Sequence, residues 1–122
     1  MKYCIGITGS TGSLGRVILK RFKKFKIKRF KGDIRNRNEV LNWVLKNKIQ
    51  IIIHLAAVVP IKIVNQNKKK AKEVNFIGTK NIVDASIKNK IIWFFFSSTS
   101  HVYSSSNKPI SERCLKNPIS FY

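Results

Sequence analysis

Residues 2–15, KYCIGITGSTGSLG, decide the fold of this chain. The first half of this stretch alternates apolar side chains from Tyr3 to Thr8, which predicts a strand. Three glycines follow at three-residue intervals, and an amphipathic run from about Ser13 to Lys24 predicts a helix. A strand, a glycine loop and a helix in this order are typical of sites that bind the pyrophosphate of a dinucleotide.

The three glycines are Gly9, Gly12 and Gly15. Glycine permits turns with positive φ, and without a Cβ the backbone can approach a phosphate closely. The first N–H groups of the next helix have no internal partners, and the helix dipole favours an anion there. The spacing is G-x-x-G-x-x-G rather than G-x-G-x-x-G. The alternative, a flexible turn that binds nothing, is disfavoured by the flanking strand and helix.

The composition indicates one basic domain or part of one, with 122 residues, 43% of them hydrophobic. Lys and Arg total 25 against 5 Asp and Glu, which gives a formal net charge of +20. Such a balance can indicate a nucleic-acid partner, but the basic residues are spread along the chain and form no recognition motif. We therefore expect attraction of anionic cofactors and substrates, and no specific nucleic-acid partner.

The cysteines and histidines do not predict a metal site, because Cys4 and Cys114 lack metal-type spacing and neither His54 nor His101 is close to them in sequence. Reduced thiols in a cytoplasmic protein are the simplest interpretation. No apolar run reaches membrane-spanning length, and no secretory signal precedes the first strand. We expect no membrane association.

The rest of the chain alternates predicted strands and helices, which favours an α/β fold with a doubly wound, Rossmann-type parallel sheet, here incomplete. The expected elements are a strand over 25–30, a helix over 38–48, a strand over 50–57, a loop over 58–67, a helix over 68–89, a strand over 91–97 and a long loop from residue 98. We interpret His54, inside the third strand, as a core residue. The apolar fourth strand would be left at an uncovered edge.

Asp33 follows the second strand, 18 residues after Gly15. An acidic residue near this point can accept hydrogen bonds from the adenosine ribose or bind the adenine edge. Alternatively, Asp33 is a turn residue that caps the next helix. The glycine loop upstream favours the cofactor role.

Six motifs occur in one order along the chain: TGSTGSLG (8–15), GDIRN (32–36), HLAA (54–57), VN followed by GT (74–75 and 78–79), SSTSHVY (97–103) and PISFY (118–122). This order resembles the extended short-chain dehydrogenases/reductases, which are the NAD(P)-dependent epimerase/dehydratase proteins and act mostly on nucleotide sugars. The match covers the whole chain, and six ordered motifs are far more specific than one glycine loop.

The resemblance implies roles for individual residues. Thr99 and Tyr122 align with the catalytic Ser/Thr and with the Tyr of the Tyr-x-x-x-Lys motif. A phenol is a weak acid, so nearby positive charge would be needed to favour the phenolate that takes a proton from a sugar hydroxyl. The residues expected to bind NAD or NADP, or to support that site, are Gly9, Thr11, Gly12, Ser13, Leu14, Gly15, Asp33, Ile34, Leu55, Ala56, Ala57, Asn75, Ser97 and Ser98.

Three departures from the family pattern limit the prediction. The segment between Gly15 and Asp33 is short and has no separate ribose-binding acid, so NAD and NADP both stay open; the basic candidates for a 2′-phosphate are Arg16, Arg29 and Lys31. Ser100-His101 replaces the Asp-Glu pair of the sugar 4,6-dehydratases, which leaves epimerase or reductase activity. The sequence stops at Tyr122, before the motif's Lys and the substrate-binding C-terminal region.

We therefore expect an N-terminal fragment, residues 1–122, of a nucleotide-sugar epimerase or reductase. This fragment would be inactive by itself, and the full-length protein would be a homodimer. Two alternatives stay open. A non-catalytic nucleotide-binding module would keep only the Rossmann half, and a basic nucleic-acid-binding domain would show salt-sensitive DNA or RNA binding without competition from NAD(P).

Overall fold

The structure, a computed structural model, describes residues 3–118 and 120–122. Lys2 of the glycine-loop stretch and Ile119 of the PISFY motif lie outside this range. The elements are β1 Cys4–Thr8, α1 Ser13–Arg21, β2 Lys26–Arg29, α2 Arg37–Asn47, β3 Ile51–His54, α3 Ile61–Gln66, α4 Lys68–Lys72, the π-helical η1 Glu73–Gly78, α5 Thr79–Lys88, β4 Trp93–Phe96 and the 3₁₀ turn η2 Ser100–Val102.

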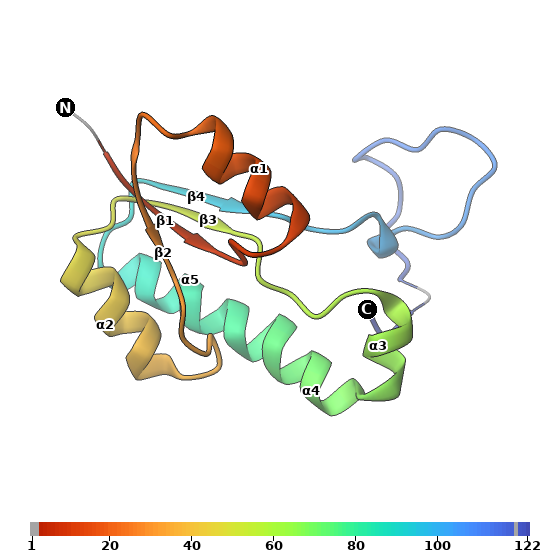
Figure 1. The fold of residues 1–122 in the computed structure, drawn as a ribbon. Helices are drawn as coiled ribbons and strands as arrows, with labels where there is room; N and C mark the ends of the chain where they lie inside the picture. The colour runs from red at the N-terminus through yellow and green to blue at the C-terminus, as the bar shows by residue number, and fades with distance from the viewer. Residues whose placement is uncertain (1–2, 119) are drawn as a thin grey trace.

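The sheet has four parallel strands in the order β2-β1-β3-β4. Helix α1 covers one face, and α2 and α5 cover the other (Figure 1). This confirms the predicted doubly wound α/β fold. Because the strands are parallel, their carboxyl ends meet at one edge of the sheet, where open α/β sheets bind ligands.

Two apolar layers hold the sheet between its helices. On the α2 and α5 side, Ile52, Val40, Val44 and Ile82 are almost wholly buried. On the α1 side, Ile5, Ile7 and Ile53 form a smaller cluster with Ile18 and Leu19 as partners. Burial of an aliphatic side chain contributes about 1.5–3 kcal/mol, so these layers supply most of the driving force for folding.

Strand β4 lies at the edge of the sheet, as predicted. Its residues alternate between faces: Phe94 packs against the α2 and α5 layer, whereas Trp93 and Phe95 stack on each other with ring centroids 6.0 Å apart. Trp93 is 53% exposed and Phe95 is 39% exposed. The α1 side of the sheet is therefore uncovered at β4.

Several predicted boundaries were wrong. Helix α1 ends at Arg21, three residues early, because the chain turns at Phe22 to bring β2 beside β1. The third strand ends at His54 rather than Ala57, since the N–H groups of Leu55 and Ala56 donate to Thr8 Oγ1. The predicted loop over 58–67 contains the short helix α3.

The helix predicted over 68–89 is observed as α4, η1 and α5 in direct succession. Asn67 caps its start, with its side chain accepting from the N–H of Lys70 at 2.9 Å. Gly78 permits a close approach, but the partner is the Ile34 side chain and not the sheet: a Cβ on Gly78 would lie 2.5 Å from Ile34 Cγ1. None of the helices within the described ranges is long and apolar enough to cross a bilayer.

Candidate dinucleotide site

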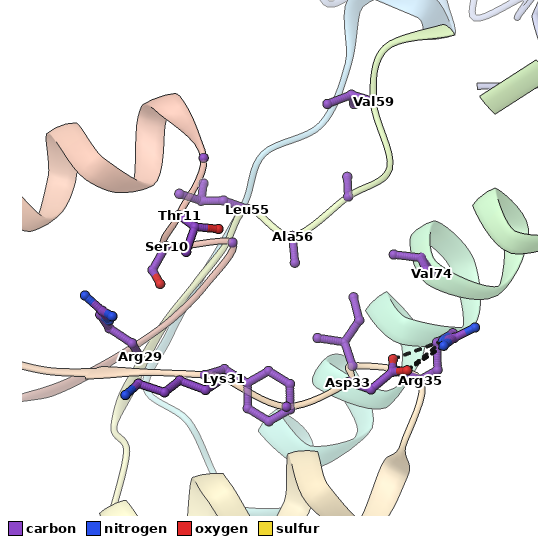
Figure 2. A pocket seen from close by; sticks show the side chains of 16 residues that line it. Ser10, Thr11, Arg29, Lys31, Asp33, Arg35, Leu55, Ala56, Val59 and Val74 are labelled. Carbon is purple, nitrogen blue, oxygen red and sulfur yellow. Dashed lines mark hydrogen bonds and ion pairs between the residues drawn. The ribbon is translucent and has the colours of Figure 1, made fainter. Parts of the chain in front are cut away.

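A cavity of about 870 Å³ opens along the carboxyl ends of β1, β2 and β3 (Figure 2). It is lined by the glycine loop (residues 9–12), by residues 29–35 at and after the end of β2, by residues 55–57 after β3, and by Val59 and Val74. All three segments leave parallel strands at the same edge of the sheet. The parallel strand order therefore sets the position of the cavity, and the side chains of these loops set which ligand groups it can bind.

The glycine loop packs tightly against the backbone that follows β3. Gly9 has φ +68, and a Cβ there would lie 2.7 Å from the backbone N of Ala56. Gly15 lies behind the loop, where a Cβ would be 2.4 Å from the Gly9 carbonyl oxygen. Gly12 differs, because a Cβ there would meet only that same oxygen, at 3.4 Å. Gly9 and Gly15 are thus required by the packing, whereas Gly12 leaves open space in the cavity wall.

Helix α1 begins at the wall of this cavity, with its first backbone donors unpaired. Gly12 is its N-cap and provides no side-chain hydrogen bond. The first helical bond runs from Arg16 N–H to the Gly12 carbonyl, at 3.0 Å. Within residues 3–118 and 120–122, no acceptor serves the N–H groups of Ser13, Leu14 and Gly15. With the helix dipole, these N–H groups form a site suited to a phosphate.

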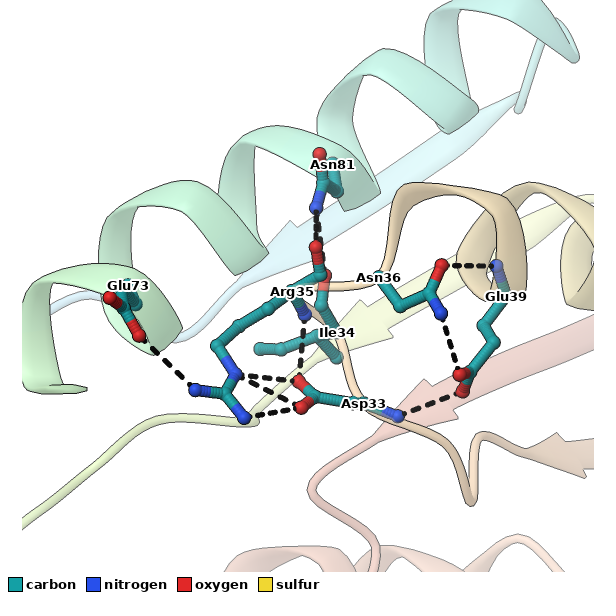
Figure 3. A network of polar contacts seen from close by, with 7 residues as sticks. All are labelled: Asp33, Ile34, Arg35, Asn36, Glu39, Glu73 and Asn81. Atoms are coloured by element: carbon teal, nitrogen blue, oxygen red, sulfur yellow. Dashed lines mark hydrogen bonds and ion pairs between the residues drawn. The ribbon is translucent and has the colours of Figure 1, made fainter.

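The loop after β2 is fixed by a polar network (Figure 3). Arg35 pairs with Asp33, its Nη2 2.6 Å from Oδ2, and reaches Glu73 Oε2 at 3.2 Å. Asn81, buried in α5, donates to the carbonyl oxygens of Ile34 and Arg35 at 3.0 and 2.9 Å. Hydrogen bonds from Arg35 to the Asp33 carboxylate lower the pKa of Asp33 below its usual 3.8. Bonds to Asn81 in α5 and to Glu73 in η1 therefore fix the conformation of this loop without a ligand.

Asp33 does not cap α2. Asn36 is the N-cap, and its side chain accepts from the N–H groups of Asn38 and Glu39. Glu39 in turn accepts from the Asn36 side chain at 2.8 Å and from the Asp33 N–H at 3.1 Å. The capping part of the alternative for Asp33 is therefore wrong. Its turn part is borne out, because Asp33 Oδ1 accepts from the Arg35 N–H at 2.9 Å. The carboxylate lies at the cavity in a pair with Arg35.

His54 joins the end of β1 to α5 from within the core. Leu55 N–H and Ala56 N–H both donate to Thr8 Oγ1, at 3.2 Å each. These bonds use both lone pairs of the hydroxyl, so the Thr8 O–H donates to His54 Nδ1, at 2.6 Å. Nε2–H then donates to Thr79 Oγ1, at 2.9 Å. Burial lowers the pKa of His54 to about 4, so the ring is neutral at pH 7. The core interpretation of His54 is confirmed.

A second cavity, of about 140 Å³, adjoins the first and shares Leu55, Ala56 and Ala57 with it. Thr99 and Tyr122, the predicted catalytic pair, both line it. The other predicted residues in its wall are Asn75, Ser97 and Ser98. The Thr99 hydroxyl accepts from His101 N–H at 3.1 Å, and the His101 and Tyr122 rings lie edge to face at 5.6 Å.

Asn75, in the π-helical segment, anchors the loop between the two cavities. Its side chain accepts from Val58 N–H at 2.7 Å and donates to Val58 C=O at 3.1 Å. A π-helical turn inside a helix is frequently found at a functional site. The contact fixes the backbone just beyond Ala57.

The structure thus brings most of the predicted site residues to two adjoining cavities. Gly9, Thr11, Gly12, Asp33, Ile34, Leu55, Ala56 and Ala57 line the first, and the residues predicted near the catalytic pair line the second. Ser13, Leu14 and Gly15 lie in the first turn of α1, outside the lining of both. The residues of the first cavity that sequence analysis missed are Ser10, Phe30, Gly32, Arg35, Val59 and Val74. Arg35 belongs to the GDIRN motif and lies two positions after Asp33, and this short spacing of opposite charges could have predicted their ion pair.

Comparison with known proteins agrees with this geometry. The model of the NAD dependent epimerase/dehydratase family matches residues 5–122. The chain therefore belongs to the NAD dependent epimerase/dehydratase family.

Individual relatives are only partly covered. The UDP-N-acetyl-alpha-D-glucosaminuronate decarboxylase of Bacillus cytotoxicus is 38% identical over 68 residues, which are 56% of this chain and 21% of that protein. The structure of Thermus thermophilus UDP-glucose 4-epimerase with NAD has a TM-score of 0.89 at 18% identity, covering 98% of this chain and 46% of that one. The structure of the dTDP-4-dehydrorhamnose reductase of Bacillus anthracis with NADP has a TM-score of 0.87 at 26% identity. The match covers 100% of this chain and 45% of that one. The chain spans less than half the length of each of these proteins.

Proposed function

We propose that this chain is the dinucleotide-binding part of an NAD(P)-dependent nucleotide-sugar epimerase or reductase. The proposal rests on two features that lie next to each other at the carboxyl edge of the sheet, a phosphate-type site and a cavity with the predicted catalytic pair. The free N–H groups of α1 lie beside the first cavity, and the Thr99 and Tyr122 side chains line the cavity that adjoins it. An elongated ligand could extend from the first cavity into the second past residues 55–57.

The residues divide the binding of NAD(P) between them. The glycine loop and the α1 N–H groups would hold the pyrophosphate, because Gly12 leaves space in the cavity wall and the first N–H groups of α1 have no acceptor among the described residues. The rigid loop around Asp33 and Ile34 would receive the adenosine end. Leu55, Ala56 and Ala57 would lie against the nicotinamide half, where their small or apolar side chains let a flat ring approach.

The chemistry of the chain itself is a proton transfer. The hydride chemistry at a sugar carbon would come from NAD(P) when it is bound. Tyr122 would take the proton from the reacting sugar hydroxyl as a phenolate, or return it as a phenol. Thr99 would orient that hydroxyl by a hydrogen bond. Asn75 would act as a positioning residue, since its side chain is already engaged with the backbone of Val58.

The proposal is tested on the gene product that contains this chain, with UDP-glucose and dTDP-glucose as trial substrates. Tyr122→Phe is expected to lower turnover by about 10²-fold or more, because it removes the proton acceptor. The dissociation constants of NADH and NADPH, measured by calorimetry, should stay within about twofold, since Tyr122 lies in the second cavity. Thr99→Val should cost less turnover than Tyr122→Phe.

Two results would contradict the proposal. Normal turnover in Tyr122→Phe would refute the role of that residue. Tight cofactor binding without turnover of any nucleotide sugar would favour a non-catalytic nucleotide-binding module instead.

A further inference from the structure

Two basic side chains border the first cavity at the end of β2. Arg29 is the last residue of β2, and Lys31 follows two residues later. Both are exposed, and neither forms an ion pair or a side-chain hydrogen bond with any residue that the structure describes. In Figure 2 they extend to the left, away from the Asp33–Arg35 pair. Their charges are available to a ligand.

The position of these residues relates them to the adenosine ribose. β2 pairs with β1, with Arg29 opposite Ile7, and Phe30 N–H continues the ladder to the Ile7 carbonyl at 2.9 Å. The end of β2 therefore lies one strand away from the start of the glycine loop. In sites that bind a dinucleotide over such a loop, the residues at this point contact the 2′ position of the ribose.

The cavity offers no free carboxylate to a 2′-hydroxyl. Asp33 is the only acidic residue among the described residues that line it. Its carboxylate receives three bonds from the Arg35 guanidinium, two from Nε at 3.0 Å and one from Nη2 at 2.6 Å. A carboxylate occupied by a guanidinium has little capacity left for a ribose hydroxyl.

We propose that this site selects the 2′-phosphorylated cofactor, NADP(H), over NAD(H), and that Arg29 and Lys31 bind the 2′-phosphate. The inference rests on the proposed function, because it assumes that the cavity holds the adenosine end of NAD(P). Arg supplies a planar fork of donors to a phosphate, and Lys supplies a point charge. Arg16, the third basic candidate from the sequence, lies outside the cavity lining and has no part in the selection.

The test is calorimetric titration of the chain with NADPH and NADH, and with adenosine 2′,5′-bisphosphate and 5′-AMP, at about 0.15 M salt, where long-range charge effects are screened. NADPH is expected to bind about tenfold or more tightly than NADH, since it makes charge-assisted hydrogen bonds that NADH cannot. Arg29→Ala and Lys31→Ala should each remove most of this preference and leave NADH binding within about twofold. Lys31→Asp should favour NADH, because a free carboxylate could then accept from the 2′-hydroxyl.

The matched control is Lys26→Ala. Lys26 is an exposed cation on the same strand that does not line the cavity, so its removal should change both affinities slightly and equally. Equal or tighter binding of NADH by the wild-type chain would overturn the inference and leave the proposed function standing. A loss of NADPH affinity in Lys26→Ala as large as in Arg29→Ala would also overturn it. Binding of neither cofactor by a folded chain would refute the proposed function itself.

Discussion

The Thr8 hydroxyl and the His54 imidazole form a 2.6 Å hydrogen bond that joins the end of β1 to the end of β3. Thr8 is the last residue before the glycine loop, and Leu55 and Ala56, which donate to the same hydroxyl, begin the opposite cavity wall. One side chain thus sets the spacing of two walls of the site. These hydrogen bonds behind the cavity therefore help to fix the position of the backbone that lines it.

Replacing Thr8 with Val tests this arrangement. Thr8→Val keeps the shape of the side chain but removes its hydroxyl. Two backbone N–H groups and His54 Nδ1 then lose their hydrogen-bond partner. The free energy of unfolding should fall by roughly 2–4 kcal/mol, because each unpaired buried polar group carries a desolvation penalty. Urea denaturation measures this change. Thr8→Ser, which keeps the hydroxyl, should cost only about 1 kcal/mol for the lost methyl group. Equal losses in the two variants would contradict the bonding role.

Stability should depend on pH through His54. The pKa of the buried ring is about 4, against 6.5 for an ordinary histidine, so the unfolded chain binds a proton between these values and the folded chain does not. Stability should therefore fall as the pH is lowered from about 6.5 to about 4, by on the order of 3 kcal/mol. Asp33 and Asp84 have pKa values lowered from 3.8, so their contributions are lost mainly below this window.

The measurement for this prediction is the urea midpoint at pH 7, 5.5 and 4.5. A His54→Gln variant removes the titrating group and should show a much flatter dependence across the same pH range. A wild-type midpoint that stays constant from pH 7 to 4.5 would mean that the imidazole is not held neutral by burial.

The three glycines should respond differently to substitution. Gly12 has extended backbone, φ −69 and ψ 171, and room for a side chain, so Gly12→Val should change stability by no more than about 1 kcal/mol. It should nevertheless abolish NAD(P)H binding, since the new side chain would project toward the pyrophosphate. Gly15→Ala should destabilise the fold by roughly 1–3 kcal/mol, because its Cβ meets the Gly9 carbonyl.

Paired thermal denaturation and calorimetric titration separate these effects. Unchanged cofactor affinity in a folded Gly12→Val chain would show that the glycine loop does not hold the pyrophosphate. Normal stability of Gly15→Ala would show that α1 can move away from the loop.

The uncovered face of β4 should limit solubility. Trp93 and Phe95 expose apolar rings on an edge strand, which is an aggregation hazard. Trp93→Thr with Phe95→Lys should raise the concentration at which light scattering detects aggregates by about twofold or more. Phe94→Thr is the matched control, because Phe94 faces the core and its loss should lower the melting temperature without improving solubility. The same solubility for wild type and double variant would contradict this prediction.

The sequence predicted the four strands and the glycine loop because their signals are local. Alternating or continuous apolar runs and fixed glycine spacing depend on few residues, whereas the strand order β2-β1-β3-β4 came only from the structure. The six ordered motifs singled out Thr99 and Tyr122, and both residues line the second cavity.

The remaining features depend on contacts between distant segments. The bonds from Asn81 to the loop after β2 join residues 46 and 47 positions apart, and Arg35 reaches Glu73 across 38 positions. The packing of Gly78 on Ile34 likewise required the fold. Helix α3 was missed because Pro60, at its N-cap position, offers no side-chain hydrogen bond and the segment is short.

The most direct test of the central claim is a nuclear magnetic resonance titration of the ¹⁵N-labelled chain with NADPH. If the dinucleotide binds at the glycine loop, the largest amide shift changes should occur at Ser13, Leu14 and Gly15, whose N–H groups would gain a phosphate acceptor. Smaller changes should appear along residues 29–35 and 55–57, which line the cavity. Saturable shifts confined to other surfaces, or no shifts at all in a folded chain, would contradict the assignment of this site.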